Sequence, residues 1–315
     1  QTIVNDLPVA ERRIIEIARA LEGQADILVM DEPTASLSEQ ESEQIFVILR
    51  QLKERGTSIV YISHYLKEVF EISDRIVVLR DGMNAGEFDP KTTEVPDVVN
   101  AMLGKVAGSM FEDRPAIPEQ SEVILSCSDL SLPGVIDNVS FDLRAGEILG
   151  VFGLIGSGVE VLGRLIFGAE GRPPAGSLTL KGQPYTPISP LKGKNAGIGF
   201  VTAERKTDGI MANMSVRENL VAAFQSDYGG KIMTAPKRET AHSLDWIERL
   251  GIKTVGPEQA IRFLSGGNQQ KVCVARWLNP KVNVLILEEP TRGVDVGARK
   301  DIYRQLVAFA REGLA

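Results

Sequence analysis

The feature that most constrains this chain is an internal repeat of domain length. Residues 7–49 can be laid on residues 264–306 without a gap, at an offset of 257 positions. The residues that meet an identical partner at this offset are Leu7, Ala18, Arg19, Leu21, Leu28, Glu32, Pro33, Thr34, Ile45 and Leu49. A period this long indicates two copies of one domain, in contrast to an array of short repeats. Because the chain has 315 residues, we expect the back part of a first copy and most of a second.

The composition excludes several classes of protein. Hydrophobic residues make up 43% and charged residues 24% of the chain, as in ordinary globular domains. The net charge of −7 argues against broad non-specific attraction to nucleic acid or anionic lipid. The longest uncharged apolar stretch has 12 residues, too few to span a bilayer. Cys127 and Cys273 lie far apart without CxxC spacing, which argues against a disulfide framework or a cysteine zinc site and fits a reducing cytoplasm.

The hydrophobic pattern predicts an α/β fold. Short apolar runs are typical of strands, and apolar residues at helical spacing are typical of helices. In the first copy we predict helices over 14–21 and from the Ser38–Glu41 capping box to Gly56, and strands at 27–30, 58–62 and 75–79. In the second copy we predict strands at 139–143 and 148–152 and a helix over 159–167. Strands that alternate with helices imply a largely parallel sheet.

A change of composition marks the boundary between the copies. Between residues 104 and 122 the periodicity stops, and Gly, Pro and charged residues dominate, as in a linker. We therefore predict the C-terminal part of a first domain at 1–106, a linker at 107–122, and a second domain at 123–315 that lacks its C-terminal end. No basic segment followed by an apolar one opens the chain, so we predict no secretion signal, and the first residue, Gln1, is consistent with a fragment.

A glycine-rich loop follows a predicted strand and precedes a predicted helix. In such a setting, backbone N–H groups and a helix N-terminus cradle phosphates. The candidate nucleotide-binding residues of this loop are Gly153, Gly156, Ser157 and Gly158. A full phosphate loop continues with Lys and then Ser or Thr, whereas this chain carries Val159 and Glu160. Losing one charge-assisted hydrogen bond costs about 1.5–3 kcal/mol, and a tight turn that needs glycine for packing is the alternative interpretation.

Two further motifs of the second copy stand 24 residues apart. The segment LSGGN precedes a predicted helix, and its candidate nucleotide-binding residues are Ser265, Gly266, Gly267 and Asn268. Ser265 is the predicted N-cap, and the glycines leave N–H groups open to an anion. The second motif places Glu288 and Glu289 at the end of a predicted buried strand. Paired acids there indicate a metal or proton site, while a capped helix and structural ion pairs are the alternatives.

The first copy repeats the same spacing. Asp31 follows Leu7 by 24 residues, and Glu32 comes next. This pair of acids suits the holding of a Mg²⁺ ion through water and the polarisation of an attacking water molecule. His64 ends the neighbouring predicted strand, 32 residues after Glu32, where an imidazole can reach a γ-phosphate. A lone His at a strand end is otherwise structural, so its assignment depends on the acids beside it.

In this order, the glycine loop, the LSGGN segment, the strand ending in two acids and the strand ending in Ser-His resemble an ATP-binding-cassette ATPase, a P-loop NTPase. The chain is particularly similar to the tandem ATPase subunit of bacterial importers for monosaccharides such as ribose, xylose or galactose. The stretches that carry the resemblance are 31–43, 63–82, 264–278 and 288–303. The resemblance implies an α/β fold with a mainly parallel sheet and a helical lobe, in two copies of which the first is partial, and truncation at both ends.

The resemblance also implies how the motifs combine. Cassettes of this family meet head to tail, within one chain or between two, so that each ATP lies between the phosphate loop and acids of one copy and the LSGGN segment of the other. One composite site would join Asp31, Glu32 and His64 to the intact segment 264–268. It is the candidate for hydrolysis, with Glu32 and His64 catalytic and Asp31 on the metal.

The other composite site departs from the family pattern. It would join the loop 153–160, the metal ligand Glu288 and the catalytic residue Glu289 to the segment 7–11, where Pro8 replaces the serine. Phosphoryl transfer depends on neutralising developing charge, and here a carboxylate replaces the hydroxyl and a valine replaces the cation. The resemblance therefore implies slow or absent turnover at this site.

The function implied is that of an energy-coupling ATPase that uses ATP and Mg²⁺ for sugar import. Its partners would be integral membrane permease subunits and, indirectly, an extracellular sugar-binding protein, with no nucleic acid. Its place would be cytoplasmic, on the inner face of the cell membrane. The alternative is a soluble tandem cassette that acts on ribosomes or DNA, which would favour a basic surface. In a third interpretation the isolated chain is weakly active or inactive, because its better catalytic half lacks a phosphate loop.

Overall fold

The computed structural model describes residues 3–4, 7, 9–22, 25–34, 37, 39–80, 82–104, 121–154, 156–171, 174–228, 235–294 and 296–315. The chain divides into two compact units, 1–109 and 110–315. Each unit contains its own hydrophobic clusters. The predicted linker lies almost wholly outside the described residues, so the predicted domain limits stay a prediction.

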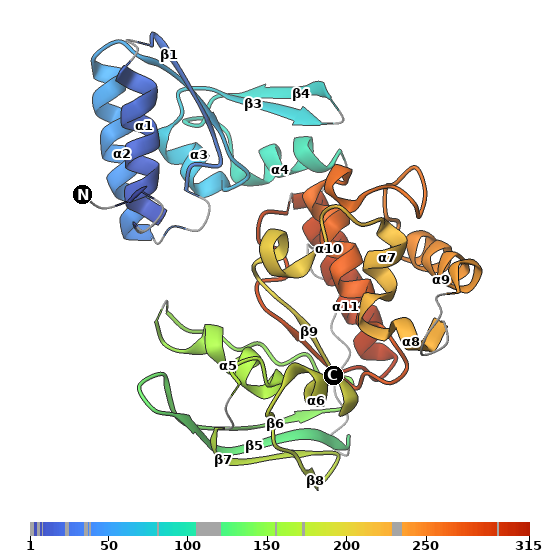
Figure 1. The fold of residues 1–315 in the computed structure, drawn as a ribbon. Helices are drawn as coiled ribbons and strands as arrows, with labels where there is room; N and C mark the ends of the chain where they lie inside the picture. Colours follow the sequence, from blue (N-terminus) through green and yellow to red (C-terminus); the bar gives the residue numbers. More distant parts are fainter. Residues whose placement is uncertain are drawn as a thin grey trace. The chain divides into compact units, whose positions relative to one another are not determined.

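The first unit alternates helices and strands (Figure 1, blue to cyan). Its elements are α1 (Val9–Glu22), β1 (Ile27–Asp31), α2 (Glu39–Glu54), β2 (Ser58–Ile62), α3 (Leu66–Ile72), β3 (Ile76–Arg80), β4 (Met83–Phe88) and α4 (Val95–Leu103). The helices and strands predicted for this copy are therefore present. The capping residue Ser38 lies outside the described residues, and β4, which the pattern did not predict, pairs antiparallel with β3.

Strands β1 and β2 run parallel and in register, from Ile27 opposite Ser58 to Asp31 opposite Ile62. Helices α1 and α2 cover one face of this pair, because alternate strand residues point to them. The buried cluster between them comprises Ile17, Leu28, Met30, Ile45, Phe46, Leu49 and Leu52. The apolar run 27–30 suits a buried strand, but β1 is buried on one face only, because Val29 on the other face is 62% exposed.

The second unit combines an antiparallel sheet, a parallel strand pair and a helical part. Its strands are β5 (Val123–Leu132), β6 (Ile136–Arg144), β7 (Ala175–Leu180), β8 (Gln183–Pro184), β9 (Ile198–Val201) and β10 (Val284–Leu287). Its α-helices are α5 (Val159–Phe167), α6 (Pro190–Asn195), α7 (Val216–Val221), α8 (Gln225–Tyr228), α9 (Pro236–Arg249), α10 (Gly266–Ala275) and α11 (Val296–Arg311). A π-helical turn covers Arg205–Gly209, and short 3₁₀ turns cover Ala222–Phe224 and Ile261–Phe263.

Among the described residues, three hydrophobic clusters lie in the second unit, and two of them are large. One lies between α5 and the sheet β6-β5-β7-β8, and includes Leu130, Leu165 and Ile198, all fully buried. The other lies within the helical part, where α7, α9 and α10 group together (Figure 1). Strands β9 and β10 form a separate parallel pair. In the described part of the chain, every helix is too short or too polar to cross a lipid bilayer.

The predictions for the second copy are confirmed in part, with two corrections. The expected mainly parallel sheet is wrong for this unit, because the described sheet β6-β5-β7-β8 is antiparallel throughout and only β9 and β10 pair in parallel. A short connection such as the one between β5 and β6 permits antiparallel pairing, whereas parallel strands need a long crossover. Helix α5 spans the predicted 159–167, and β6 contains the predicted strand 139–143. The predicted strand at 148–152 is wrong, because this segment forms no strand. A strand needs a neighbour for its backbone hydrogen bonds, and none of the described strands pairs with it. Its apolar side chains are accordingly uncovered, with Val151 50% and Phe152 94% exposed.

Candidate nucleotide site

The parallel pairing of β1 and β2 brings an acid and an imidazole together in the first unit. Glu32 directly follows β1 and His64 lies two residues after the end of β2, and the Glu32 N–H donates to the Ile62 carbonyl at 2.8 Å. His64 Nδ1 lies 2.7 Å from Glu32 Oε1. His64 is only 9% exposed and its Nε2 has no hydrogen-bond partner among the described residues, whereas Glu32 is 37% exposed. The structure therefore confirms the predicted proximity of these two side chains.

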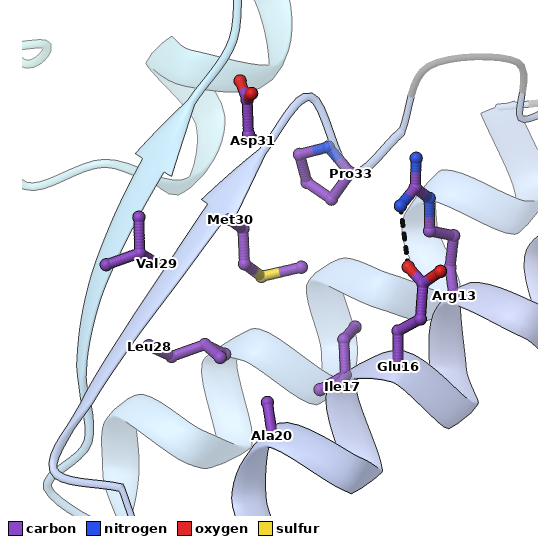
Figure 2. Close-up of a pocket in the computed structure, with 9 residues that line it drawn as sticks. All are labelled: Arg13, Glu16, Ile17, Ala20, Leu28, Val29, Met30, Asp31 and Pro33. Atoms are coloured by element: carbon purple, nitrogen blue, oxygen red, sulfur yellow. Dashed lines mark hydrogen bonds and ion pairs between the residues drawn. The ribbon is translucent and has the colours of Figure 1, made fainter.

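Asp31 ends β1 on the exposed face of the strand. Figure 2 shows Val29 and Asp31 on one face, and Leu28 and Met30 on the other, toward α1. The latter face lines a cavity of about 150 Å³ whose rim carries the ion pair between Arg13 and Glu16 (Figure 2). Ligand pockets usually measure roughly 300–1,000 Å³, so this cavity is small for a nucleotide. Asp31 also lines this cavity, but its side chain is exposed to solvent, next to Glu32 in the chain.

The glycine loop of the second unit has the backbone of a phosphate cradle at its end. Gly156 and Gly158 adopt left-handed conformations with φ of +83° and +86°. A Cβ atom at Gly158 would lie 2.4 Å from the Val135 carbonyl oxygen, so packing also requires glycine there. Gly158 is the N-cap of α5, and Glu160 lies exposed in the first turn. The loop thus leads into a helix N-terminus, but the first turn of that helix carries the Glu160 carboxylate. The predicted residues Gly153 and Ser157 lie within the described part of the loop, and Ile155 lies outside it.

The LSGGN segment opens α10 as predicted, with Ser265 at the N-cap position. The expected side-chain cap is absent, because Ser265 Oγ accepts a hydrogen bond of 2.8 Å from the Asn268 amide in its place. Asn268 is buried and also accepts from the Lys253 N–H at 2.8 Å. Gly267 is buried, whereas Ser265 is exposed. The first-turn N–H groups are therefore not capped by the serine, which leaves an arrangement suited to an anion.

The acid pair of the second unit follows β10. The Glu288 N–H donates to the Val201 carbonyl at 2.9 Å, and the Ala203 N–H points to Glu288 Oε2 at 3.4 Å. Glu288 Oε1 is buried without a hydrogen-bond partner among the described residues. Burial raises the pKa of the Glu288 carboxyl above its ordinary value, although the Ala203 N–H and the charge of Arg164 act in the opposite direction. Burial therefore disfavours the ionised form of Glu288, which is the form that would bind a metal ion.

Glu289 has a partner that the sequence analysis missed. Its Oε2 lies 3.5 Å from Arg292 Nε, and Arg292 Nη1 lies 2.8 Å from Glu204 Oε1. Glu204 lies three residues after the end of β9, on the side where the acid pair follows β10. Comparing the two copies could have drawn attention to Arg292, because Ala35 stands at the equivalent position of the first copy.

The two halves differ in how well they fit Mg²⁺ and ATP. Mg²⁺ usually takes one or two protein carboxylates and completes its octahedron with phosphate oxygens and water. The exposed Asp31, beside Glu32, fits this role. Glu288 fits less well because its ionised form is disfavoured by burial and Glu160 occupies the position of the usual hydroxyl ligand. The segments 153–158 and 265–268 both offer main-chain N–H groups at a helix N-terminus, as phosphates require.

Within the second unit the structure brings some predicted residues close. Helix α5 packs beside the acid strand, since a Cβ atom at Gly163 would lie 2.8 Å from Ile286 and 3.7 Å from Glu288 Oε1. The glycine loop and the acid pair therefore share one end of this unit. The predicted pairing of the Asp31, Glu32 and His64 group with the segment 264–268 joins different units and stays a prediction.

Comparison with known proteins agrees with these motifs. Residues 136–292 match the family model described as ABC transporter. The chain is 43% identical over 313 residues to the ribose import ATP-binding protein RbsA 1 of Rubrobacter xylanophilus, covering 98% of this chain and 62% of that protein. It is 39% identical over 314 residues to the ribose import ATP-binding protein RbsA of Cereibacter sphaeroides, covering 100% and 62%. The chain therefore spans about three fifths of the length of these curated relatives.

Solved structures identify the fold. A crystal structure described as a nucleotide-free ATP-binding cassette from an ABC transporter matches with a TM-score of 0.52 at 20% identity, over 61% of this chain and 79% of that one. Together with the family match at 136–292, this shows the α/β fold of an ATP-binding-cassette ATPase. That the first unit is a partial copy of the same fold stays a prediction from the internal repeat.

Proposed function

Starting from the cassette fold of residues 136–292, we propose that this chain is part of the ATP-binding, energy-coupling subunit of a bacterial monosaccharide importer. Two relatives that align with almost the whole chain carry the name of ribose import ATP-binding proteins, which supports a pentose or a similar sugar as cargo. ATP binding would close two cassettes on one another, and hydrolysis would reopen them. The motion would be passed to permease subunits at the inner face of the cell membrane, with an extracellular sugar-binding protein as an indirect partner.

We propose that each ATP is held by two cassette copies, within one chain or between two chains. One copy would contribute acids, and the other would contribute main-chain N–H groups and Ser265 of the segment 265–268. When bound, Mg²⁺ would neutralise phosphate charge. Asp31 would hold the ion, Glu32 would orient and activate the attacking water, and His64 would steady the γ-phosphate. The observation that carries this assignment is the 2.7 Å contact between His64 and Glu32, which fixes the acid beside a buried imidazole.

We propose further that the site built on the second acid pair is degenerate. Its phosphate loop carries Val159 and Glu160 in place of a cation and a hydroxyl. Its acid Glu289 faces a guanidinium where Glu32 faces an imidazole. Because turnover requires developing negative charge to be neutralised, these features support nucleotide binding with little hydrolysis at this site.

The experiment that tests the proposed function uses the full-length polypeptide containing this sequence, assembled with its permease in vesicles. We expect ATP supplied on the side of the ATPase subunit to drive uptake of a labelled monosaccharide in the presence of the matching sugar-binding protein. The same vesicles with ADP provide the control. ATP turnover that is indifferent to permease and sugar, or that responds to ribosomes or DNA, would contradict the proposal.

A further inference from the structure

The second acid pair carries its own cation, Arg292, in the turn that directly follows it. The guanidinium contacts two carboxylates, Glu204 at 2.8 Å and Glu289 at 3.5 Å. The Arg292 side chain is 31% exposed, whereas the Glu204 and Glu289 side chains are 59% and 66% exposed. The arginine therefore contacts two exposed acids at the carboxyl end of the parallel pair β9–β10, one following each strand.

The repeat shows that this cation is a property of the second copy. Glu32 and Glu289 occupy equivalent positions and share a left-handed backbone, with φ of +44° and +40°. The residue three positions after Glu32 is Ala35, which has no charge to offer. In the first copy the acid contacts His64 instead, at 2.7 Å. The same backbone conformation thus presents an acid in contact with an imidazole in the first unit and an acid in contact with a guanidinium in the second.

The turn that carries Arg292 is itself held by a second arginine. Arg205, at the start of the π-helical turn, directs Nη1 to the Arg292 carbonyl and Nη2 to the Gly293 carbonyl, both at 3.5 Å. Its guanidinium also packs against the LSGGN segment, since a Cβ atom at Gly266 would lie 2.9 Å from Nη2. Gly266 is likewise close to the Gly293 carbonyl, at 2.9 Å from the same Cβ position. The position of the turn is therefore set by two other segments of the unit.

We propose that Arg292 is a built-in counter-ion that makes the second acid pair a poor site for a divalent cation, and that it ties this pair to the turn bearing Glu204. A positive charge within a few ångströms of Glu289 opposes the approach of a second cation and occupies one of its carboxylate oxygens. Arg292 is a positioning residue in this proposal, because it affects cation binding only through its contact with Glu289. The inference rests on the proposed function only in treating the acid pair 288–289 as the place where a divalent cation would bind, with Glu289 next to the expected metal ligand Glu288.

The test measures Mn²⁺ binding to the full chain without nucleotide, by electron paramagnetic resonance of the free ion. The background carries Asp31→Asn and Glu32→Gln, so that the first pair does not contribute. We expect Arg292→Gln, which keeps length and hydrogen bonding but removes the charge, to tighten Mn²⁺ binding about fivefold, the scale of one screened charge at this distance. Arg292→Lys keeps the charge and should stay within about twofold of the background.

Adding Glu289→Gln to Arg292→Gln should abolish the tighter Mn²⁺ binding, because that binding depends on the Glu289 carboxylate that Arg292 no longer contacts. The inference is overturned if Arg292→Gln leaves Mn²⁺ binding unchanged. The same holds if neither the background protein nor its Arg292→Gln variant binds Mn²⁺ detectably. It is also overturned if Arg292→Lys tightens binding as much as Arg292→Gln, since space and not charge would then be responsible. Failure of ATP-driven sugar uptake bears on the proposed function and not on this result, because no nucleotide is present.

Discussion

At the scale of single residues, the acids Glu32 and Glu289 share a backbone conformation and differ in the charged group beside them. Glu32 and Glu289 are among the few residues other than glycine with positive φ, at +44° and +40°. L-residues rarely adopt this region, and such conformations concentrate at functional sites. Both acids follow a parallel strand, and both strand ends are joined to a neighbouring strand by a backbone hydrogen bond. What distinguishes them is the partner, His64 for one and Arg292 for the other.

Because the pKa of Glu288 is raised, we expect that replacing this carboxyl increases the stability of the fold in a pH-dependent way. Because the folded-state pKa lies above the unfolded value, this carboxyl stabilises the fold only where it is protonated, and that contribution is lost as the pH rises through the folded pKa. Glu288→Gln should therefore raise the melting temperature of the second unit at pH 7.5, by about 2–4 °C for a change of about 1 kcal/mol. The gain should shrink toward zero near pH 4, as measured by calorimetry.

A matched control for this prediction lies on the neighbouring helix. Glu160 is an exposed acid near the same end of the unit. Glu160→Gln should show no comparable pH-dependent gain. An equal gain in both variants would mean that general charge repulsion, and not burial of Glu288, is the cause.

The residues of the site could be predicted only where they recur. The spacing shared by the two copies singles out Asp31, Glu32 and the pair 288–289 from sequence alone. His64 could be assigned because a second strand end meets the first in a parallel sheet. The contact of Arg292 could not be predicted, because its ion pair depends on a turn that brings it beside Glu204, 88 residues earlier in the chain. Sequence spacing carries no information on such a contact.

At the scale of helices and strands, the hydrophobic pattern was most accurate where local signals agree. Helix α5 was predicted to the residue because glycines in left-handed conformations flank it, at Gly158 and Gly168. The pattern failed at residues 148–152, which are apolar and strand-like but have no pairing neighbour among the described strands. It also failed to predict β4, whose residues Met83–Phe88 have low strand propensity and form a strand only through pairing with β3.

The capping box at the start of α7 gives a prediction at this scale. Ser215 Oγ accepts from the Glu218 N–H at 3.1 Å, and the Glu218 carboxylate accepts from the Ser215 N–H at 2.8 Å. Helix α7 packs in the helical cluster through Val216 and Leu220. Ser215→Ala should therefore cost about 1 kcal/mol, measured by denaturant unfolding of the second unit. Ser226→Ala, at an exposed serine in α8, is the control and should change the free energy of unfolding by less than about 0.5 kcal/mol; equal losses would contradict a capping role.

At the scale of the whole molecule, the two units should differ in stability. Each has its own buried clusters, so each can unfold as a unit. The parallel pair of the first unit leaves one face uncovered, with Ile27 61%, Val29 62% and Val60 49% exposed. The core of the second unit around α5 is more completely buried. Less apolar burial means less stabilisation per residue, so the first unit should unfold first.

Hydrogen exchange of the full chain checks this prediction. Amides of β1 and β2 should exchange at least about tenfold faster than those of α5 and β5, a difference of roughly 1.4 kcal/mol in opening free energy. Calorimetry should show two transitions. A single transition with uniform protection across both units would contradict it.

The central claim is that the two acid pairs are unequal, with Glu32 at the hydrolytic site and Glu289 at the degenerate one. The most direct measurement is ATP turnover by the full-length polypeptide in its transport complex, comparing Glu32→Gln with Glu289→Gln. The account predicts a loss of about 100-fold or more for Glu32→Gln, the usual contribution of a general base. For Glu289→Gln it predicts a rate within about twofold of the parent, as expected for a site with little turnover of its own. Equal losses in the two variants, or a loss confined to Glu289→Gln, would contradict it.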